Sequence, residues 1–248
     1  DDKIIRVERI VKIDSTSQLL ASILSKKISV DSKYVLIDIP YGNSAKVTKK
    51  QAKELKRKFL NLGRKFDLKL DVVLTDGSEP IGNGIGPILE IIDVIKVLNS
   101  DNDAPKDLRE KSIMLAGELI ELSGKVEKGQ GKKLAKEILD SGKAFKKFEQ
   151  IIKAQKGKIK SLKPGRYSYD IKVKTKTKIN HLNNKLINSL ARQAGCPEDK
   201  AAGIYLHKKK GNIIGKGEKV MTIYSTSKER LAHAMKFYNK NKKQMIKY

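Results

Sequence analysis

The chain has 248 residues, of which 39% are apolar and 33% charged, and its one cysteine is Cys196. This length suits one large or two medium domains with a substantial core, and one cysteine excludes an internal disulfide framework. No apolar run approaches the roughly 18 residues that span a bilayer, and the first residues, Asp-Asp-Lys, lack the pattern of a secretory signal. The composition predicts a soluble, cytoplasmic protein that does not enter a membrane.

The basic residues, 54 in number, outnumber the 28 acidic ones and give a formal charge of +26. Such an excess is typical of proteins that bind nucleic acids. Most of these residues are lysines spread over the whole chain, whereas bidentate recognition of phosphate favours arginine. We therefore interpret the charge as a solvated surface of the kind found in thermophiles, and keep nucleic-acid binding as the less favoured alternative.

The first third of the chain alternates strand and helix patterns. Residues 34–39 form an apolar run typical of a buried strand, and residues 70–75 form a second one. Between them, Thr48 and Gln51 have the spacing of a capping box, and an apolar stripe from Ala52 to Phe66 follows. Another helix is predicted over residues 87–98. Strand, helix, strand and helix with short loops predict a parallel sheet in an α/β domain with flanking helices.

Two clear strands are few for a parallel sheet, which needs neighbouring strands and helices on both faces. Residues 4–13 are a candidate for one more strand. We therefore expect the chain to be a fragment of a longer protein or to pair with another chain. Beyond the sheet, residues 107–156 are predicted to be helical, with a stop at Gly124 and a second helical stretch over 133–156.

A second, smaller domain is predicted after a linker at residues 161–165. Its pattern changes to a period of two over residues 167–179, as in a half-buried strand. The further elements expected are a helix at 181–194, strands at 204–207 and 219–224, and a helix at 227–238. The predicted organisation is thus an α/β domain over 1–160 and an α+β domain over 163–248.

Two short segments have residues that suit ligand binding. Ser22 and Lys26 lie one helical turn apart, so a hydroxyl and an ammonium group could together recognise the edge of a planar polar ligand. Lys46 follows the C-terminal end of a predicted parallel strand, where open α/β sheets bind their ligands. In both cases an ordinary solvated surface position is the alternative.

A glycine-rich segment joins the second strand to the next helix. Glycines at 82, 84 and 86 permit close backbone approach and positive φ angles. Pro87 breaks the G-x-G-x-x-G dinucleotide pattern, and no Gly-Lys-Ser/Thr follows as in a P-loop. By itself the segment predicts a tight loop near a ligand or a subunit boundary.

Taken together, three segments carry a family resemblance: ASILSKK at 21–27, LIDIP at 36–40 and LTDGSEPIGNGIGPILE at 74–90. In this order and spacing they resemble the thymidine/pyrimidine-nucleoside phosphorylase family, and most of all its archaeal AMP phosphorylase branch. The segment KPGRYSY at 163–169 and the α+β unit after it are similar to the C-terminal domain of that family. The resemblance covers nearly the whole chain.

The resemblance implies phosphorolysis of a nucleoside monophosphate, in which AMP and phosphate become adenine and ribose 1,5-bisphosphate. Asp14 matches the proton donor of the family, Ser22 and Lys46 match residues that contact the nucleotide, and Lys26 matches a lysine that contacts the base. A proton donor is needed because the base leaves with the electron pair of the broken bond. The alternative for Asp14 is a cap on the helix that starts near Ser17.

Two departures from the family limit these expectations. Val7 stands where pyrimidine-specific relatives carry an arginine, with Arg6 one position off register, which favours a nucleotide over thymidine or uridine. The phosphate-binding glycine segments of the family have no counterpart here, so we expect the chain alone to be inactive or nearly so. We expect a homo-oligomer, and a further hypothesis, compatible with the enzyme, is that residues 163–248 form a non-catalytic assembly domain that mainly drives oligomerisation. The resemblance implies no cofactor and no catalytic metal, although some relatives hold a monovalent cation at the position of Glu90.

Overall fold

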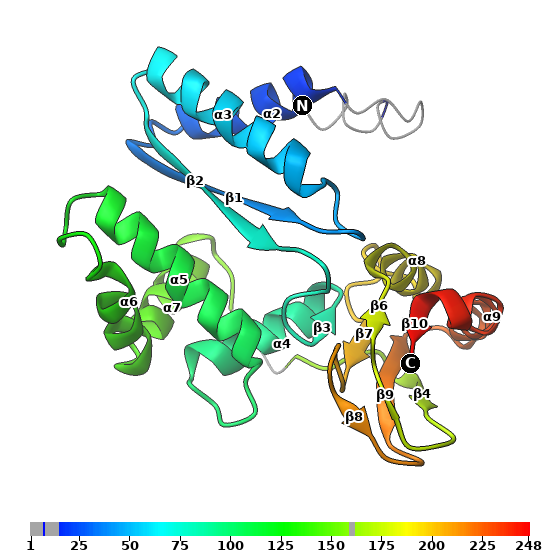
Figure 1. The fold of residues 1–248 in the computed structure, drawn as a ribbon. Coiled ribbons are helices and arrows are strands. Elements are labelled where there is room, and N and C mark those ends of the chain that lie inside the picture. Colours follow the sequence, from blue (N-terminus) through cyan, green and yellow to red (C-terminus); the bar gives the residue numbers. More distant parts are fainter. Residues whose placement is uncertain (1–6, 8–14, 159–161) are drawn as a thin grey trace.

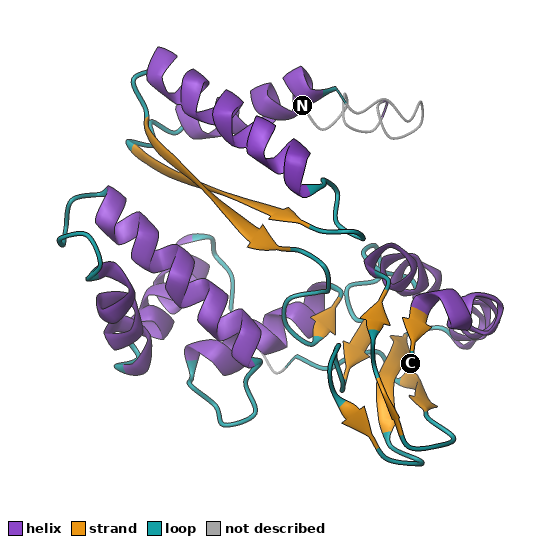
Figure 2. Ribbon diagram, in the orientation of Figure 1, coloured by secondary structure: helices purple, strands orange, loops and turns teal. Residues whose placement is uncertain are grey.

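The computed structural model describes residues 7, 15–158 and 162–248. Helices and strands alternate at first, helices alone follow, and strands and helices mix again at the C-terminal end (Figures 1 and 2), which confirms the mixed α/β class. The elements in chain order are α2 (Thr16–Ile28), β1 (Tyr34–Tyr41), α3 (Lys49–Lys65), β2 (Lys69–Asp76), β3 (Gly84–Ile85), α4 (Pro87–Leu98), α5 (Lys106–Leu122), α6 (Gly131–Asp140), α7 (Lys143–Ala154), β4 (Tyr167–Lys172), β5 (Thr177–Lys178), β6 (His181–Leu182), α8 (Asn184–Ala194), β7 (Gly203–Leu206), β8 (Ile213–Ile214), β9 (Lys219–Ser225), α9 (Lys228–Met245) and β10 (Ile246–Lys247).

Strands β1 and β2 form a parallel pair, with Tyr34 opposite Lys69 and Tyr41 opposite Asp76. Helices α2 and α3 cover one face of this pair, and α5 lies along the other (Figure 1). The face toward α3 is apolar, because alternate residues of β1 are buried there against Phe59. This face forms the core of the first part of the chain.

The face toward α5 is partly polar. Asp38 of β1 accepts a hydrogen bond of 2.6 Å from the hydroxyl of Thr75, and its second oxygen lies 2.6 Å from the ammonium of Lys111. Lys111 also donates to Thr75 over 3.0 Å. The three half-buried side chains thereby attach α5 to both strands, because each polar group among them has a partner.

Helix α3 begins as the sequence predicts. The hydroxyl of Thr48 accepts from the amide of Gln51, and the side chain of Gln51 accepts from the amide of Thr48, which completes the capping box. The prediction that Phe66 belongs to the apolar stripe is wrong, since its side chain is 55% exposed. Helix α3 ends at Lys65, so Phe66 leaves the helical phase that buries Phe59.

The helical region also departs from the prediction at one point. The stretch expected over 133–156 is two helices, because Gly142 adopts a φ of 73° between α6 and α7. The stop predicted at Gly124 is confirmed, with α5 ending at Leu122 and Gly124 at a φ of 73°.

The C-terminal part contains a four-stranded sheet in the order β3-β7-β9-β4, with its neighbouring strands antiparallel. Helices α8 and α9 cover the apolar face of this sheet and enclose a core that includes Leu190, Ile204 and Ile223. The strand expected over 167–179 ends at Lys172, because the chain turns and pairs elsewhere as β5.

Two further boundaries in this part differ from the expectation. Helix α8 starts at Asn184 rather than at 181, because β6 pairs with β10 at the end of the chain. Helix α9 begins close to the predicted start and continues to Met245 instead of ending near 238. Both boundaries lie next to the pair of β6 and β10, whose residues are more than 60 positions apart in the chain. The periodicity of a helix does not reveal such a long-range pairing.

One strand crosses between the two parts of the chain. Strand β3, which lies in the glycine-rich segment, pairs with β7 through Gly84 opposite Tyr205 and Ile85 opposite Ile204. The domain boundary at 160–163 stays a prediction. Of the strand proposed for residues 4–13, all residues except Val7 lie outside the described part of the chain, so this strand stays a prediction. Among those described, no helix is both long and apolar enough to cross a membrane.

Candidate functional site

Helix α2 carries two of the predicted site residues. It begins at Thr16 with Ser15 as its cap, whose hydroxyl accepts from the amide of Gln18 over 3.4 Å. Ser15 therefore occupies the cap position of this helix. Asp14 itself lies outside the described residues, so its role as proton donor stays a prediction.

Ser22 and Lys26 lie along the flank of α2. The buried side of this helix is formed by Leu20 and Leu24, at 7% and 2% exposure. Ser22 is half-buried and Lys26 is exposed. Since residues three and four apart share a helix face, Leu19, Ser22 and Lys26 lie on one side of α2.

Lys46 lies in the loop between β1 and α3, at the C-terminal end of β1 as predicted. It lines a hollow of ≈ 280 Å³ between α2 and α3, together with Thr16 and Leu19 of α2. Ser22 and Lys26 are not among the lining residues of this hollow, although they share the side of α2 with Leu19. The structure therefore places Lys46 beside the first turn of α2. In the sequence, this turn follows closely after Asp14, the expected proton donor.

The loop with Lys46 is held by the start of the glycine-rich segment. The amide of Gly77 donates to the carbonyl of Tyr41 over 2.8 Å. The buried hydroxyl of Ser44 donates to the carbonyl of Ser78 over 3.0 Å. A Cβ added to Gly77 would lie 2.9 Å from the Cβ of Pro40, so the two loops interlock too closely for a side chain.

The glycine-rich segment as a whole lies against the C-terminal part of the chain. Leu206 donates its amide to the carbonyl of Asn83 over 2.7 Å, and the amide of Lys210 donates to the carboxylate of Glu79 over 3.0 Å. The ammonium of Lys209 donates to the carbonyl of Pro80 over 3.1 Å. The sequence predicted a ligand site or a subunit boundary here, and the structure shows a contact between two parts of one chain.

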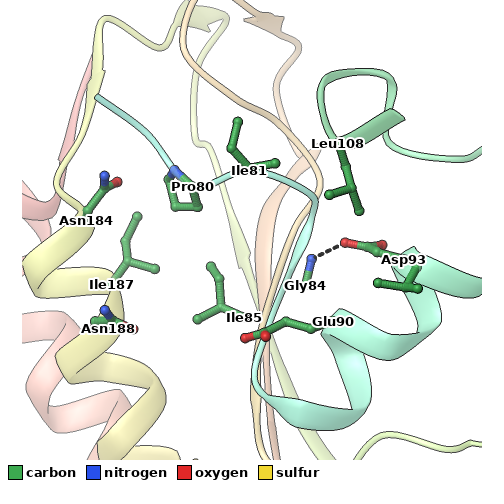
Figure 3. Close-up of a pocket in the computed structure, with 11 residues that line it drawn as sticks. Pro80, Ile81, Gly84, Ile85, Glu90, Asp93, Leu108, Asn184, Ile187 and Asn188 are labelled. Carbon is green, nitrogen blue, oxygen red and sulfur yellow. Dashed lines mark hydrogen bonds between the residues drawn. The ribbon is translucent and has the colours of Figure 1, made fainter. Parts of the chain in front are cut away.

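A cavity of ≈ 440 Å³ lies between this segment and α8. Figure 3 shows Asn184, Ile187 and Asn188 of α8 on one side of the cavity, with Ile85 and Glu90 opposite them. Its walls are mostly apolar, and polar groups are supplied by the two asparagines and by the acidic residues of α4. The cavity is separate from the hollow that contains Lys46.

Asp93 of α4 lies at the base of the glycine-rich segment. It is 1% exposed, and its Oδ2 accepts from the amides of Asn83 and Gly84 over 2.6 and 2.7 Å. Burial raises the pKa of this carboxyl above its ordinary value of 3.8, against the opposing effect of these two hydrogen bonds. Its Oδ1 has no hydrogen-bond partner within the described part of the chain.

Glu90 lies three residues before Asp93 on the same helix. Its Oε1 accepts from the amide of Gly86 over 2.9 Å at the N-terminus of α4, where a carboxylate also interacts favourably with the helix dipole. A monovalent cation at Glu90 stays a prediction. Val7, at the position of the missing arginine, is 58% exposed, and Arg6 lies outside the described residues.

Asn184, Lys209 and Asp93 were not singled out by the sequence. Each is a polar residue in a helix or turn whose partner is far away in the chain or is a backbone amide. No local spacing signals such a contact. Only the glycines at 82, 84 and 86 indicated that backbone segments approach closely here.

Comparisons with known proteins find similar sequences over nearly the whole chain. Residues 178–244 match the pyrimidine nucleoside phosphorylase C-terminal domain, a region that runs from β5 into α9. The chain is 46% identical over 241 residues to an AMP phosphorylase from Methanococcus aeolicus, which covers 96% of this chain and 48% of the relative. An AMP phosphorylase from Methanococcus maripaludis is 44% identical over 239 residues, covering 95% of this chain and 47% of the relative.

A second group of relatives has a different printed name. A "Putative thymidine phosphorylase" from Legionella pneumophila is 45% identical over 235 residues, which covers 94% of this chain and 45% of the relative. The chain thus spans about half the length of the curated relatives that it matches. Over nearly its whole length the chain is therefore similar to about half of an AMP phosphorylase or of a protein named putative thymidine phosphorylase, and its residues 178–244 match the C-terminal domain of pyrimidine nucleoside phosphorylases.

Proposed function

We propose that this chain supplies the nucleotide-binding half of an enzyme that cleaves AMP with phosphate. The observation that carries the proposal is the 46% identity to an AMP phosphorylase over 96% of the chain. The position of Lys46 beside the first turn of α2 supports it, because the resemblance assigns nucleotide contacts to this lysine.

In the proposed reaction a phosphate oxygen attacks the anomeric carbon of AMP. The bond from that carbon to the base breaks, and the base leaves with the bonding electrons. Asp14 donates the proton that the leaving base requires, while Ser22, Lys26 and Lys46 hold the nucleotide. The products are adenine and ribose 1,5-bisphosphate, and neither a cofactor nor a metal takes part.

Phosphate is not assigned to any residue of this chain. We therefore expect the 248-residue chain to bind AMP but to turn it over weakly or not at all. The reading frame around the coding sequence shows whether the gene encodes further residues. If it does, the whole encoded protein is the one to assay for release of adenine from AMP and phosphate.

Calorimetric titration of the chain with AMP, TMP, thymidine and uridine tests the binding half of the proposal. We expect AMP to bind most tightly. Lys46→Ala should weaken AMP binding by about tenfold, as loss of a charge-assisted hydrogen bond would. Lys50→Ala, an exposed lysine in the first turn of α3, is the matched control and should leave the affinity unchanged.

Thymidine phosphorolysis is the second candidate, favoured by the 45% identity to the thymidine phosphorylase-named relative. Tighter binding of thymidine than of AMP would replace the first proposal with this one. Absence of binding for every nucleoside and nucleotide in the series would contradict both.

A further inference from the structure

Helix α8 of the C-terminal part contacts the loop at the end of β2. Asn183 caps this helix, and its Oδ1 accepts from the amide of Leu186 over 3.2 Å. Asn184 is therefore not needed as a cap, and its Nδ2 donates to the carbonyl of Gly77 over 3.0 Å. Figure 3 shows Asn184 on α8 beside Pro80 of the glycine-rich segment, at the edge of the cavity.

Gly77 and Ser78 are also hydrogen-bonded to residues at the loop between β1 and α3, which contains Lys46. Gly77 donates to Tyr41 over 2.8 Å, and Ser44 donates to Ser78 over 3.0 Å. A Cβ on Gly77 would lie 3.2 Å from the Cβ of Ala45, closer than ordinary van der Waals contact. Such close packing means that residues 77–78 cannot shift without a shift of the loop around Ser44.

The loop that bears Lys46 is also closed by its own backbone. The amide of Gly42 donates to the carbonyl of Val47 over 3.2 Å, and the amide of Ala45 donates to the carbonyl of Gly42 over 3.3 Å. Lys46 lies between these residues. Three hydrogen bonds therefore connect α8 to the loop that contains Lys46. They are donated by Asn184 to Gly77, by Gly77 to Tyr41 and by Ser44 to Ser78.

We propose that the C-terminal part of the chain positions Lys46 for nucleotide binding, and that Asn184 is the positioning residue. This inference rests on the proposed function, because it assumes that Lys46 contacts the nucleotide. A shift of about 1 Å in a binding group can lower its contribution substantially. The contact from α8 limits such shifts by adding a hydrogen bond from a separate core to the carbonyl of Gly77.

Two variants remove the donor of Asn184 in different ways. Asn184→Leu keeps a similar volume without polar atoms. Asn184→Asp keeps the shape and suits the first turn of a helix, where an acidic group is stabilising, but offers no donor to Gly77. Asn188→Leu, one turn farther along α8 on the same cavity, is the matched control.

Amide hydrogen exchange of the whole chain measures the coupling directly. In both Asn184 variants the amides of Gly42 and Gly77 should exchange about fivefold to tenfold faster, since one hydrogen bond that restrains them is lost. In Asn188→Leu they should exchange at the unsubstituted rate. If both Asn184 variants stay within about twofold of that rate, the inference is overturned.

The affinity for AMP distinguishes positioning from a general structural role. Both Asn184 variants should weaken AMP binding by about threefold to tenfold, measured at a temperature at which each variant is fully folded. An Asn184→Asp variant with faster exchange but unchanged AMP affinity would also overturn the inference. If the unsubstituted chain binds no AMP, the proposed function fails, and the exchange rates still decide whether Asn184 restrains the loop.

Discussion

At the scale of single residues, Gly84 and Gly86 of the glycine-rich segment are explained by contacts with backbone atoms. A Cβ on Gly84 would lie 2.4 Å from the carbonyl carbon of Leu89, and one on Gly86 would lie 2.5 Å from the carbonyl oxygen of Ala202. Gly86 also has a φ of 128°, which L-residues rarely adopt. These glycines allow α4, β3 and β7 to meet, so their primary role in this chain is packing between two parts of the molecule.

Gly84→Ala should therefore destabilise the chain. We expect a loss of about 2–4 kcal/mol in the free energy of unfolding, because the added methyl group meets backbone that cannot rotate away. Gly215→Ala is the control, since its Cβ would meet nothing closer than 3.7 Å. Urea denaturation of both variants measures the difference, and equal midpoints would contradict the packing role.

The buried carboxyl of Asp93 predicts an unusual pH dependence. Its pKa in the folded chain is raised above 3.8, mainly by burial. The folded state then binds more protons than the unfolded state between 3.8 and the raised pKa, so this group's contribution to stability falls as the pH rises through that window. Asp93→Asn keeps an acceptor for the amides of Asn83 and Gly84 and cannot ionise.

The stability of Asp93→Asn relative to the unsubstituted chain should therefore increase as the pH is raised from about 4 to 7. Denaturant unfolding at a series of pH values measures this difference. A constant difference over the whole range would show that Asp93 titrates with the same pKa in the folded and unfolded states.

At the scale of elements, the turn between β7 and β8 connects three regions. Lys209 forms an ion pair with Asp107 at the start of α5 and donates to the carbonyl of Pro80. The side chain of Lys209 is 17% exposed and that of Asp107 is 35% exposed. Breaking a pair with this degree of burial leaves a carboxylate and a carbonyl without their cation.

Lys209→Ala should lower the free energy of unfolding by about 1–3 kcal/mol. Lys216→Ala, an exposed lysine in the next turn, is the control and should change it by less than about 0.5 kcal/mol. High salt should reduce the effect only partly, since partly buried pairs are screened less than exposed ones. An unchanged unfolding midpoint in Lys209→Ala would show that the ion pair contributes nothing to stability.

At the scale of the whole molecule, the parallel pair of β1 and β2 and the four-stranded sheet have separate cores. Phe59, Val72 and their neighbours pack between the parallel strands and α3, whereas Leu190 and Ile223 pack between the C-terminal sheet and its helices. No buried residue belongs to both clusters among those described. The connections between the two parts of the chain include β3, the polar contacts of the glycine-rich segment and the ion pair of Lys209 with Asp107.

Because the cores are separate, we expect a substitution in one core to destabilise the strands around it more than the strands of the other core. Phe59→Ala should cost about 3–5 kcal/mol in the first core, and should accelerate amide exchange in β1 and β2 far more than in β9. Leu190→Ala should have the reverse pattern. Equal acceleration in all strands by either variant would show that the chain unfolds as one cooperative unit.

The amino-acid sequence was sufficient wherever a structure depends on neighbouring residues. The capping box of α3, the apolar stripe along this helix apart from Phe66, and the whole of α4 are local patterns, and the structure confirms them. Pro87 at the start of α4 illustrates the reason, because its fixed φ favours the first turn of a helix whatever surrounds it. The family resemblance likewise depended on three local segments, and the comparisons support it.

The tertiary structure alone decided which distant residues meet. The pairing of β3 with β7, the early end of β4 and the exposure of Phe66 depend on contacts or helix ends that no local period encodes. The same holds for Asn184 and Gly77, which are 107 residues apart in the chain. A hydrogen bond across such a distance depends on how the two parts of the chain meet in three dimensions. Local residue types therefore determined the elements, and long-range contacts determined which elements support the candidate site.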